Sequence, residues 1–233
     1  MGVTNTMKGI IIAGGRGTRF SNPTNKSLLL FKGKPLIFYN IEMLLPLCSD
    51  VFVVTGYDSE HTKKEISQVF PQVIFLHNTD GVVSSLKYAL TIVSDIIDDN
   101  DFITCFGDEI ALNNDIEHML DFFYGYDSFG VIGAYTNGTE ERIKKCFSIE
   151  FEDNIRVKNL VEKPTKIINN WHGTGYGMFK KSVLDYISTQ TNYPEVIQTA
   201  INNNEIIHAY NLKGEFFNVN YQEDYSNLLS RET

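Results

Sequence analysis

Hydrophobic residues in the first half of the chain form short, β-branched runs that alternate with longer amphipathic stretches. The runs at 8–13 (KGIIIA) and 50–56 (DVFVVTG) lack polar alternation, which is typical of parallel strands covered on both faces. Between them, residues 35–45 (PLIFYNIEMLL) place Ile37 and Ile41 on one helical face behind an opening proline. The pattern therefore predicts a strand, a helix and a second strand.

The same alternation continues for two more units. A polar helix is expected at 59–70, and strands at 73–78 and 101–109 flank a helix expected at 84–97. Strands and helices in alternation predict an α/β fold whose mostly parallel, doubly wound sheet is flanked by helices.

The rhythm changes from about residue 128 onward. Four segments with strand character follow without an intervening helix, which predicts an antiparallel addition; they lie at 129–135, 145–153, 155–163 and 173–179. The hydrophobic pattern after residue 180 predicts helices at 182–187, 194–203 and 224–230. It also predicts strands at 205–212 and 215–220. We expect one domain over 1–233, with a parallel core at about 7–127, a smaller strand-rich lobe at about 128–215, and a closing strand and helix at 216–233.

Composition and charge narrow the function classes. The 233 residues contain 20 Lys and Arg against 29 Asp and Glu, a net charge of −9, which argues against a nucleic-acid or membrane-surface partner. The three cysteines, Cys48, Cys105 and Cys146, are odd in number and lack metal-ligand spacing, so free thiols in a reducing compartment are expected. No run approaches the length of a membrane span, and we expect a cytoplasmic protein.

The charge is distributed unevenly. No acid precedes Glu42, whereas the same stretch carries Lys8, Arg16, Arg19, Lys26, Lys32 and Lys34. A basic segment on an acidic protein suggests a local site for a small anion, although a solvated basic face would give the same pattern.

A glycine-rich loop (AGGRGTR, 13–19) follows the first expected strand. Its glycines let backbone N–H groups approach phosphate oxygens, and Arg16 and Arg19 can bind the same oxygens. A dinucleotide-binding loop would need a third glycine where Phe20 stands and an acid well before Glu42. The signature of a nucleotide-hydrolysing P-loop is absent. A phosphate-binding loop of another kind, or a plain tight turn, remains.

The ends of the expected parallel strands converge on this loop. Thr55 and Gly56 follow the second strand, Asn78 the third, and Gly107 with Asp108 the fourth. In open parallel sheets, ligands bind in the crevice beyond the carboxyl ends of the strands. The pattern thus predicts one ligand site at this edge.

The string KGIIIAGGRGTRF…NKSLLLFKGKPLIFYNIEML resembles the N-terminal signature of the sugar-phosphate nucleotidyltransferases, typified by glucose-1-phosphate thymidylyltransferase. The resemblance implies a Rossmann-like sheet of the nucleotide-diphospho-sugar transferase type. It implies that an NTP and a sugar-1-phosphate react to an NDP-sugar and pyrophosphate with Mg²⁺, for nucleotide-sugar or cell-surface glycan synthesis. The core would bind the nucleotide and the second lobe the acceptor.

The resemblance also assigns roles around the nucleotide. Arg19 would stabilise the departing pyrophosphate, and Lys26 would contact the reacting phosphates. The positions expected to bind the nucleotide are Ala13, Gly14, Gly15, Arg16, Gly17, Thr18, Asn78, Gly81, Ser85 and Gly107.

Later motifs follow the family order. GDE (107–109) resembles the metal-binding motif, which makes Asp108 the expected Mg²⁺ ligand, because a carboxylate beside a triphosphate needs a cation between them. VEKP (161–164) implies that Lys163, a catalytic residue, holds the acceptor phosphate and that Glu162 reaches a sugar hydroxyl. GTGYG puts Gly175 against the acceptor. FFNVNYQEDY implies a second metal ligand at Asn220, or less favourably Asn218, two positions apart on one face of the expected strand.

Two other functions stay open. NKSLL (25–29) also resembles cytidylyltransferases, so a CTP-dependent enzyme acting on phosphocholine or another small phosphate or phosphonate is the first alternative. A non-catalytic nucleotide-binding protein is the second. The sequence leaves the base, the acceptor and a homo-oligomeric state undetermined.

Overall fold

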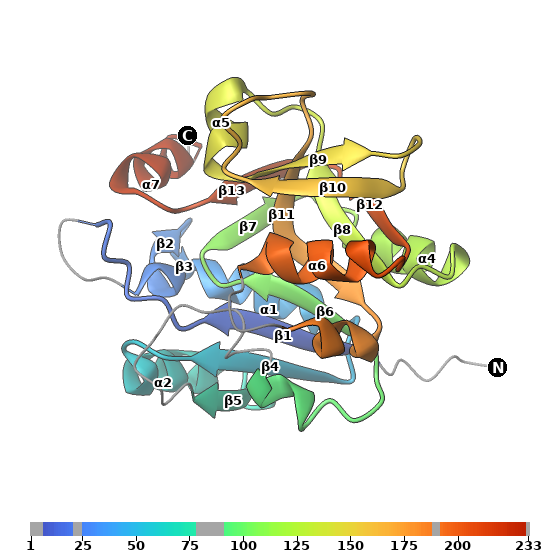
Figure 1. Ribbon diagram of the computed structural model, residues 1–233. Helices are drawn as coiled ribbons and strands as arrows, with labels where there is room; N and C mark the ends of the chain where they lie inside the picture. Colours follow the sequence, from blue (N-terminus) through green and yellow to red (C-terminus); the bar gives the residue numbers. More distant parts are fainter. Residues whose placement is uncertain (1–6, 21–24, 78–90, 188–191, 232–233) are drawn as a thin grey trace.

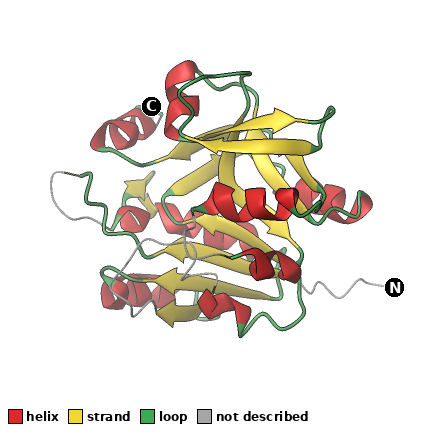
Figure 2. Cartoon of the chain, viewed as in Figure 1, coloured by secondary structure: helices red, strands yellow, loops and turns green. Residues whose placement is uncertain are grey.

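A single mixed sheet forms the centre of the molecule. The computed structural model describes residues 7–20, 25–77, 91–187 and 192–231. Within these ranges the sheet has nine strands. Seven follow the order β10-β9-β11-β6-β1-β4-β5, while β8 pairs with β11 and β12 pairs with β8 (Figure 1). Helices lie against the strands (Figure 2).

The parallel half contains the strands expected in the first part of the chain. β1 (Lys8–Ala13) pairs in parallel with β4 (Asp50–Thr55) and β6 (Phe102–Phe106). β5 (Ile74–His77) pairs in parallel with the other side of β4. The helices α1 (Leu36–Leu44) and α2 (Ser59–Val69) connect them. The predicted α/β class and its mostly parallel core are confirmed. Of the helix expected at 84–97, residues 84–90 lie outside the described residues, and residues 91–94 are helical.

The second half extends the same sheet. β11 (His172–Phe179) runs antiparallel to β6, β8 (Gly130–Tyr135) and β9 (Phe147–Phe151), and β9 pairs with β10 (Val157–Glu162). The predicted antiparallel addition is confirmed for these strands. β12 (Ile207–Asn211) differs, because it runs parallel to β8. The strand-rich part of the chain thus shares its backbone hydrogen bonds with the parallel core.

Several elements differ from the pattern-based expectation. The helices α4 (Ile116–Gly125) and α5 (Glu140–Lys145) were not predicted, and α5 begins after a Thr139 side chain that accepts a hydrogen bond from the Arg142 N–H. The helix expected at 182–187 is a 3-10 helix, η2 (Lys181–Tyr186). The remaining elements are η1 (Lys26–Leu28), the hairpin β2 (Leu30–Phe31) and β3 (Lys34–Pro35), α6 (Tyr193–Asn202) and α7 (Gln222–Leu229).

The strand expected at 101–109 breaks in the middle of the GDE motif. β6 ends at Phe106, and β7 (Glu109–Leu112) departs to pair with β13 (Glu215–Asn218) in a separate two-stranded sheet. Gly107 makes the break: its N–H donates to the Ile12 carbonyl at 2.9 Å, and a Cβ there would lie 2.5 Å from the Ser27 hydroxyl. The break leaves Asp108 between the two sheets.

The strand expected at 215–220 is shorter than its pattern indicated. β13 ends at Asn218, and the next N–H, that of Val219, still donates to the Asp108 carbonyl at 3.0 Å. Asn220 therefore lies beyond the strand, and the expectation that Asn218 and Asn220 share a strand face is wrong. The two side chains still meet, since the Asn220 amide donates to the Asn218 side-chain oxygen at 2.8 Å.

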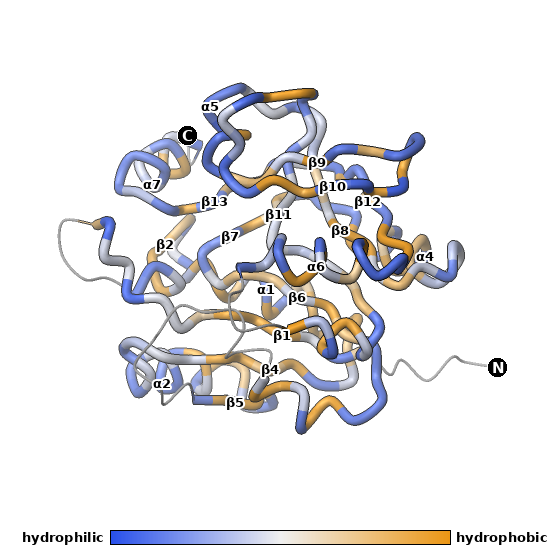
Figure 3. The backbone as a smooth tube through the Cα atoms, in the orientation of Figure 1, coloured by the Kyte–Doolittle hydropathy of each residue, from blue (hydrophilic) through white to orange (hydrophobic). Residues whose placement is uncertain are grey.

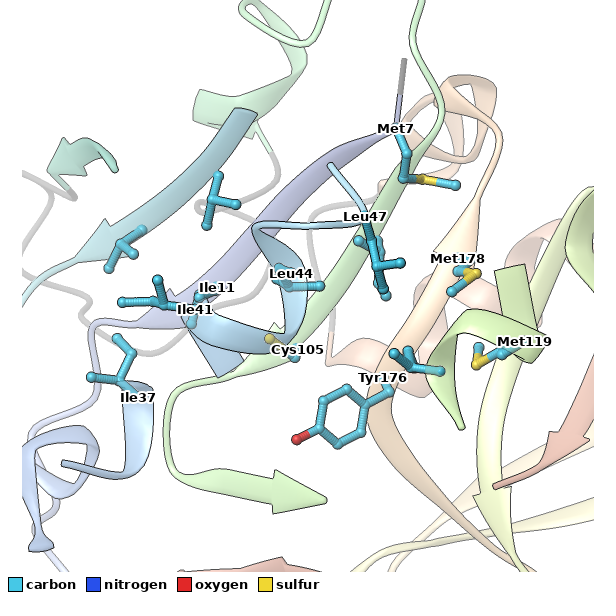
Figure 4. Close-up of a cluster of buried hydrophobic side chains, with 14 of the residues drawn as sticks. Met7, Ile11, Ile37, Ile41, Leu44, Leu47, Cys105, Met119, Tyr176 and Met178 are labelled. Atoms are coloured by element: carbon cyan, nitrogen blue, oxygen red, sulfur yellow. The ribbon is translucent and has the colours of Figure 1, made fainter. Parts of the chain in front are cut away.

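Hydrophobic side chains cover both faces of the sheet. Ile37, Ile41 and Leu44 of α1 are fully buried against Ile11 of β1 and Cys105 of β6, in the cluster drawn in Figure 4. Burial of each such aliphatic side chain contributes about 1.5–3 kcal/mol. Figure 3 shows the contrast between the apolar β1 and the largely polar α2. The core thus fixes β1, whose end carries the glycine loop.

The described cysteines are free thiols, as the sequence indicated. Within the described ranges, every helix falls short of the length and apolarity that crossing a bilayer would need.

Candidate active site

The glycine loop leaves β1 at the carboxyl edge of the parallel strands. Gly17 has a φ of +56°, which glycine adopts without strain, and the Phe20 N–H closes the turn on the Gly17 carbonyl at 3.0 Å. Phe20 is buried in a hydrophobic cluster with Phe31 and Leu36. The loop also accepts a hydrogen bond at Gly14 from the Tyr57 N–H at 3.1 Å. This anchoring leaves Gly15, Arg16, Thr18 and Arg19 exposed.

Arg19 reaches the closing segment of the chain. One of its guanidinium nitrogens lies 3.5 Å from the Asn220 side-chain oxygen, and its Cζ lies 5.5 Å from the centre of the Tyr221 ring. Residues some 200 positions apart in the sequence thereby meet at the carboxyl edge of the parallel strands.

Lys26 forms an ion pair with Asp108. The Lys26 ammonium also donates to the Val219 carbonyl at 3.0 Å, and its side chain is only 14% exposed. Asn25 positions the lysine, since its side chain caps η1 by accepting from the Ser27 N–H at 3.1 Å. The Asp108 carboxylate is thus held and partly neutralised from the protein side.

The two acids of the GDE motif have different surroundings. Glu109 is 3% exposed, and its carboxyl accepts from the Gly175 N–H and from the Asn218 side-chain amide, each at 2.8 Å. Burial and, next, the neighbouring Asp108 charge raise the pKa of Glu109 to about 8. Glu109 is therefore committed to internal hydrogen bonds. Asp108, with 21% of its side chain exposed, is the acid available to a ligand.

The two asparagines also differ in availability. Asn218 uses its amide nitrogen on Glu109 and its oxygen on Asn220. The Asn220 oxygen faces Arg19, while its backbone N–H is fixed by the Asp224 carboxylate at 3.0 Å. Of the two amide oxygens, that of Asn220 is the better placed to meet a cation.

One cavity of about 550 Å³ joins most of these groups. Its lining includes seven of the residues that the sequence assigned to a site: Arg19, Asp108, Glu162, Lys163, Gly175, Asn218 and Asn220. Lys26, Gly107 and the loop residues 13–18 are not among the lining residues. Asn78, Gly81 and Ser85 lie outside the described residues.

Lys163 directly follows β10 in a left-handed backbone conformation, with φ at +46°. Its N–H donates to the Cys146 carbonyl at 2.8 Å, which holds the turn. Its ammonium lies 3.7 Å from a Glu162 carboxylate oxygen. The turn keeps the ammonium of Lys163 at the cavity although half of the side chain is exposed.

The glycines of β11 accommodate aromatic rings of the protein itself. A Cβ at Gly173 would lie 1.9 Å from the Phe147 ring, and one at Gly175 would lie 2.1 Å from the Phe106 ring. Phe106 and Phe147 both contact Tyr193, with ring centres 5.8 and 6.2 Å apart. The sequence had linked these glycines to close approach of a ligand. In the structure they give the cavity an aromatic wall.

Sequence reasoning missed part of the cavity. Lys144 and Lys145 end α5, a helix that the hydrophobic pattern did not show, and both line the cavity. Lys145 pairs with Glu141 at 3.0 Å and with Asp224 of α7 at 3.4 Å. Figure 1 shows α5 and α7 at the same end of the molecule, above β7 and β13. The pair of lysines after Glu140 and Glu141 was the one local signal for this helix, because charges at that spacing stabilise a helix.

The oxygen donors fit a magnesium ion that is shared with phosphates. No group of three or more His, Cys, Asp or Glu side chains could hold a metal ion in the part of the chain that the structure describes. Asp108 and the Asn220 amide together offer one carboxylate and one neutral oxygen. Mg²⁺ binds such sparse oxygen sets when substrate phosphates and water complete its octahedron.

The fold is α/β, and beyond its parallel strands lie a glycine turn, several cationic side chains and the Asp108 carboxylate, groups of the kind that α/β proteins use to bind phosphate. The chain belongs to the nucleotidyl transferase family, whose sequence model matches residues 8–223. The resemblance drawn from the glycine loop and the later motifs is thereby confirmed.

Known relatives agree with this assignment. The chain is 25% identical over 234 aligned residues to the mannose-1-phosphate guanylyltransferase catalytic subunit beta of Drosophila melanogaster, covering 96% of this chain and 62% of the relative. The chain thus spans about 62% of the length of such curated relatives.

Solved structures show the same fold. A UDP-glucose pyrophosphorylase complexed with UDP-glucose superposes with a TM-score of 0.79 at 20% identity, covering 97% of both chains. The inositol-1-phosphate CTP transferase from T. maritima gives a TM-score of 0.79 at 15% identity, covering 97% of this chain and 96% of that one.

Proposed function

We propose that the protein transfers a nucleotidyl group from an NTP to a sugar-1-phosphate, giving an NDP-sugar and pyrophosphate with Mg²⁺, in nucleotide-sugar synthesis for glycans. One observation carries the proposal: Arg19, Asp108 and Lys163 come from three distant parts of the chain and line the same cavity. The names of the relatives support a sugar phosphate as acceptor.

The reaction needs no general base. A phosphate oxygen of the acceptor is already ionised at neutral pH and attacks the α-phosphorus of the NTP in line. The bond from that phosphorus to the oxygen bridging to the β-phosphorus breaks, and its electron pair leaves with pyrophosphate. No proton changes place, so the barrier is the repulsion between two polyanions.

The residues of the cavity reduce that repulsion. Lys163 binds the acceptor phosphate, Arg19 receives the charge that develops on pyrophosphate, and the N–H groups of the glycine loop hold the triphosphate. Asp108 and Asn220 would hold Mg²⁺. When bound, the ion neutralises and orients phosphate oxygens.

Lys26 acts through Asp108 in this proposal. The sequence resemblance had put Lys26 on the reacting phosphates. Its ammonium is instead paired with Asp108 and bonded to Val219, and it is absent from the cavity lining. We therefore assign Lys26 the role of orienting Asp108, the proposed metal ligand.

The side chains at the acceptor end of the cavity suit a sugar phosphate. Three ammonium groups line this region, those of Lys144, Lys145 and Lys163, and the nearby Glu162 is within 3.7 Å of Lys163. A polyhydroxylated ring can accept hydrogen bonds from these lysines and pack on Phe147 and Tyr193.

Pyrophosphate release from a matrix of substrates tests the proposal. ATP, CTP, GTP, UTP and dTTP are each combined with glucose-1-phosphate, mannose-1-phosphate, N-acetylglucosamine-1-phosphate, inositol-1-phosphate or phosphocholine. Release that requires both an NTP and a sugar-1-phosphate is expected. Asp108→Ala should abolish it, and Asp121→Ala, which removes an exposed acid of α4, should not.

Two outcomes would replace the proposal. Turnover with phosphocholine and CTP alone would establish the cytidylyltransferase alternative. NTP binding that survives Asp108→Ala, with no pyrophosphate from any pair, would indicate a non-catalytic nucleotide-binding protein.

A further inference from the structure

Tyr221 stands at the mouth of the cavity and is 43% exposed. It precedes α7, and its backbone N–H donates to the Asp224 carboxylate at 2.8 Å. Asp224 also accepts from the Asn220 N–H at 3.0 Å and pairs with Lys145 of α5. The backbone that carries the Tyr221 ring is therefore fixed to two helices.

Arg19 contacts this ring and little else. Its Cζ is 5.5 Å from the ring centre, and its bond to Asn220 is long at 3.5 Å. Among the residues that the structure describes, no carboxylate forms an ion pair with Arg19, although its side chain is exposed. The Tyr221 ring and the Asn220 oxygen are thus the side-chain partners of Arg19 at the cavity, and the ring is the broader of the two contacts.

Lys145 offers an internal comparison. Its ammonium lies 5.9 Å from the same ring, but Glu141 and Asp224 hold it at 3.0 and 3.4 Å. Lys145 therefore has charged anchors that do not depend on the ring. Arg19 has none within the described ranges.

We propose that Tyr221 is a positioning residue that holds the Arg19 guanidinium over the cavity for the leaving pyrophosphate. The inference rests on the proposed function and deepens it. A carboxylate would also hold Arg19, but it would cancel the charge and compete with phosphate. An aromatic face attracts a planar guanidinium through its quadrupole and leaves the positive charge available to an anion.

A double-mutant cycle tests this arrangement. Tyr221→Leu should lower kcat/KM roughly 5- to 10-fold, the scale of a lost cation–π contact with a misplaced catalytic group, while Tyr221→Phe keeps the ring and stays within about twofold. In the Arg19→Ala background, Tyr221→Leu should cause no further loss, because the positioned group is gone. Tyr124→Leu on α4, with a similar exposure of 47%, is the matched control.

Binding of inorganic pyrophosphate, measured by calorimetry with Mg²⁺, gives a second readout that needs no acceptor. Tyr221→Leu should weaken it only when Arg19 is present. Additive losses in the cycle, or equal losses in Tyr221→Leu and Tyr221→Phe, overturn the inference. If the wild type binds pyrophosphate but turns over no substrate pair, the proposed function fails while the cycle in binding still decides the role of Tyr221.

Discussion

The Lys26 ammonium is paired with the Asp108 carboxylate across 82 positions of the chain. The pair lies where β6 ends, and the Val219 carbonyl accepts a second hydrogen bond from the same lysine. The contact connects the segment after the glycine loop, the GDE motif and the closing segment. A cation is thereby placed beside Asp108, one of the acids that line the cavity.

Removal of this cation should impair catalysis more than folding. Lys26→Ala is expected to lower kcat/KM by roughly 10- to 100-fold, the typical cost of losing a group that orients a metal ligand. Steady-state pyrophosphate release measures the loss. Lys158→Ala, which removes an exposed lysine of β10, is the control. Near-normal activity of Lys26→Ala would contradict the assignment of Lys26 to the site.

Divalent metal binding should depend on Asp108. Chelation by EDTA is expected to abolish turnover, because two polyanions would then meet unscreened. In Asp108→Asn, Mn²⁺ in the presence of an NTP should bind at least about 10-fold more weakly, since the carboxylate proposed to hold the metal is lost. Electron paramagnetic resonance of free Mn²⁺ measures this. Unchanged affinity in Asp108→Asn would place the metal elsewhere, and the control Asp121→Asn should bind Mn²⁺ as the wild type does.

A side chain at Gly175 should destabilise the aromatic wall of the cavity. The Cβ of Gly175→Ala would meet the Phe106 ring at 2.1 Å and the Glu109 carboxyl at 2.6 Å. Overpacking of this kind typically costs about 1–3 kcal/mol in the free energy of unfolding, which urea denaturation measures. Gly125→Ala in α4 is the matched control, because nothing lies within 4 Å of the added carbon. Equal free energies of unfolding for the two variants would show that the Phe106 ring moves aside at little cost and would contradict the prediction.

The stability of the fold should decrease in acid because of His172. This residue is fully buried beside Tyr135 and Phe216, and burial, with the nearby Arg142 charge next, lowers its pKa to about 4. A histidine has a pKa of about 6.5 in the unfolded chain, so the unfolded state binds more protons between pH 6.5 and 4. The stability contribution is therefore complete above about pH 6.5 and is lost as the pH falls toward 4.

Replacement of His172 should flatten this pH dependence. His172→Phe is expected to remove a slope of up to about 1.4 kcal/mol per pH unit in the free energy of unfolding over that range. The exposed His118 gives the control variant, His118→Phe. Urea denaturation at a series of pH values measures both. An unchanged slope in His172→Phe would assign the acid sensitivity to other groups, such as His208, whose pKa burial also lowers.

The sequence by itself determined the elements with a strong local pattern. Buried, largely β-branched runs specified β1, β4 and β6, because a strand covered on both faces is apolar along most of its length. The glycine loop and Asp108 could be placed at one edge from strand order alone, since parallel strands end on the same side. The helices α4 and α5 were not predicted. α4 follows β7, the short strand after the break in the GDE motif, and α5 has a single buried residue, Ile143.

Only the tertiary structure decided how the side chains of the site divide their tasks. Asp108 and Glu109 are neighbours with the same chemistry, yet the backbone break between the sheets exposes one and buries the other. Likewise, Lys26 pairs with Asp108, and Tyr221 meets Arg19, across 82 or more positions. Hydrophobic periodicity carries no information about such contacts, because they depend on where separate elements pack in space and on which polar groups that packing removes from water.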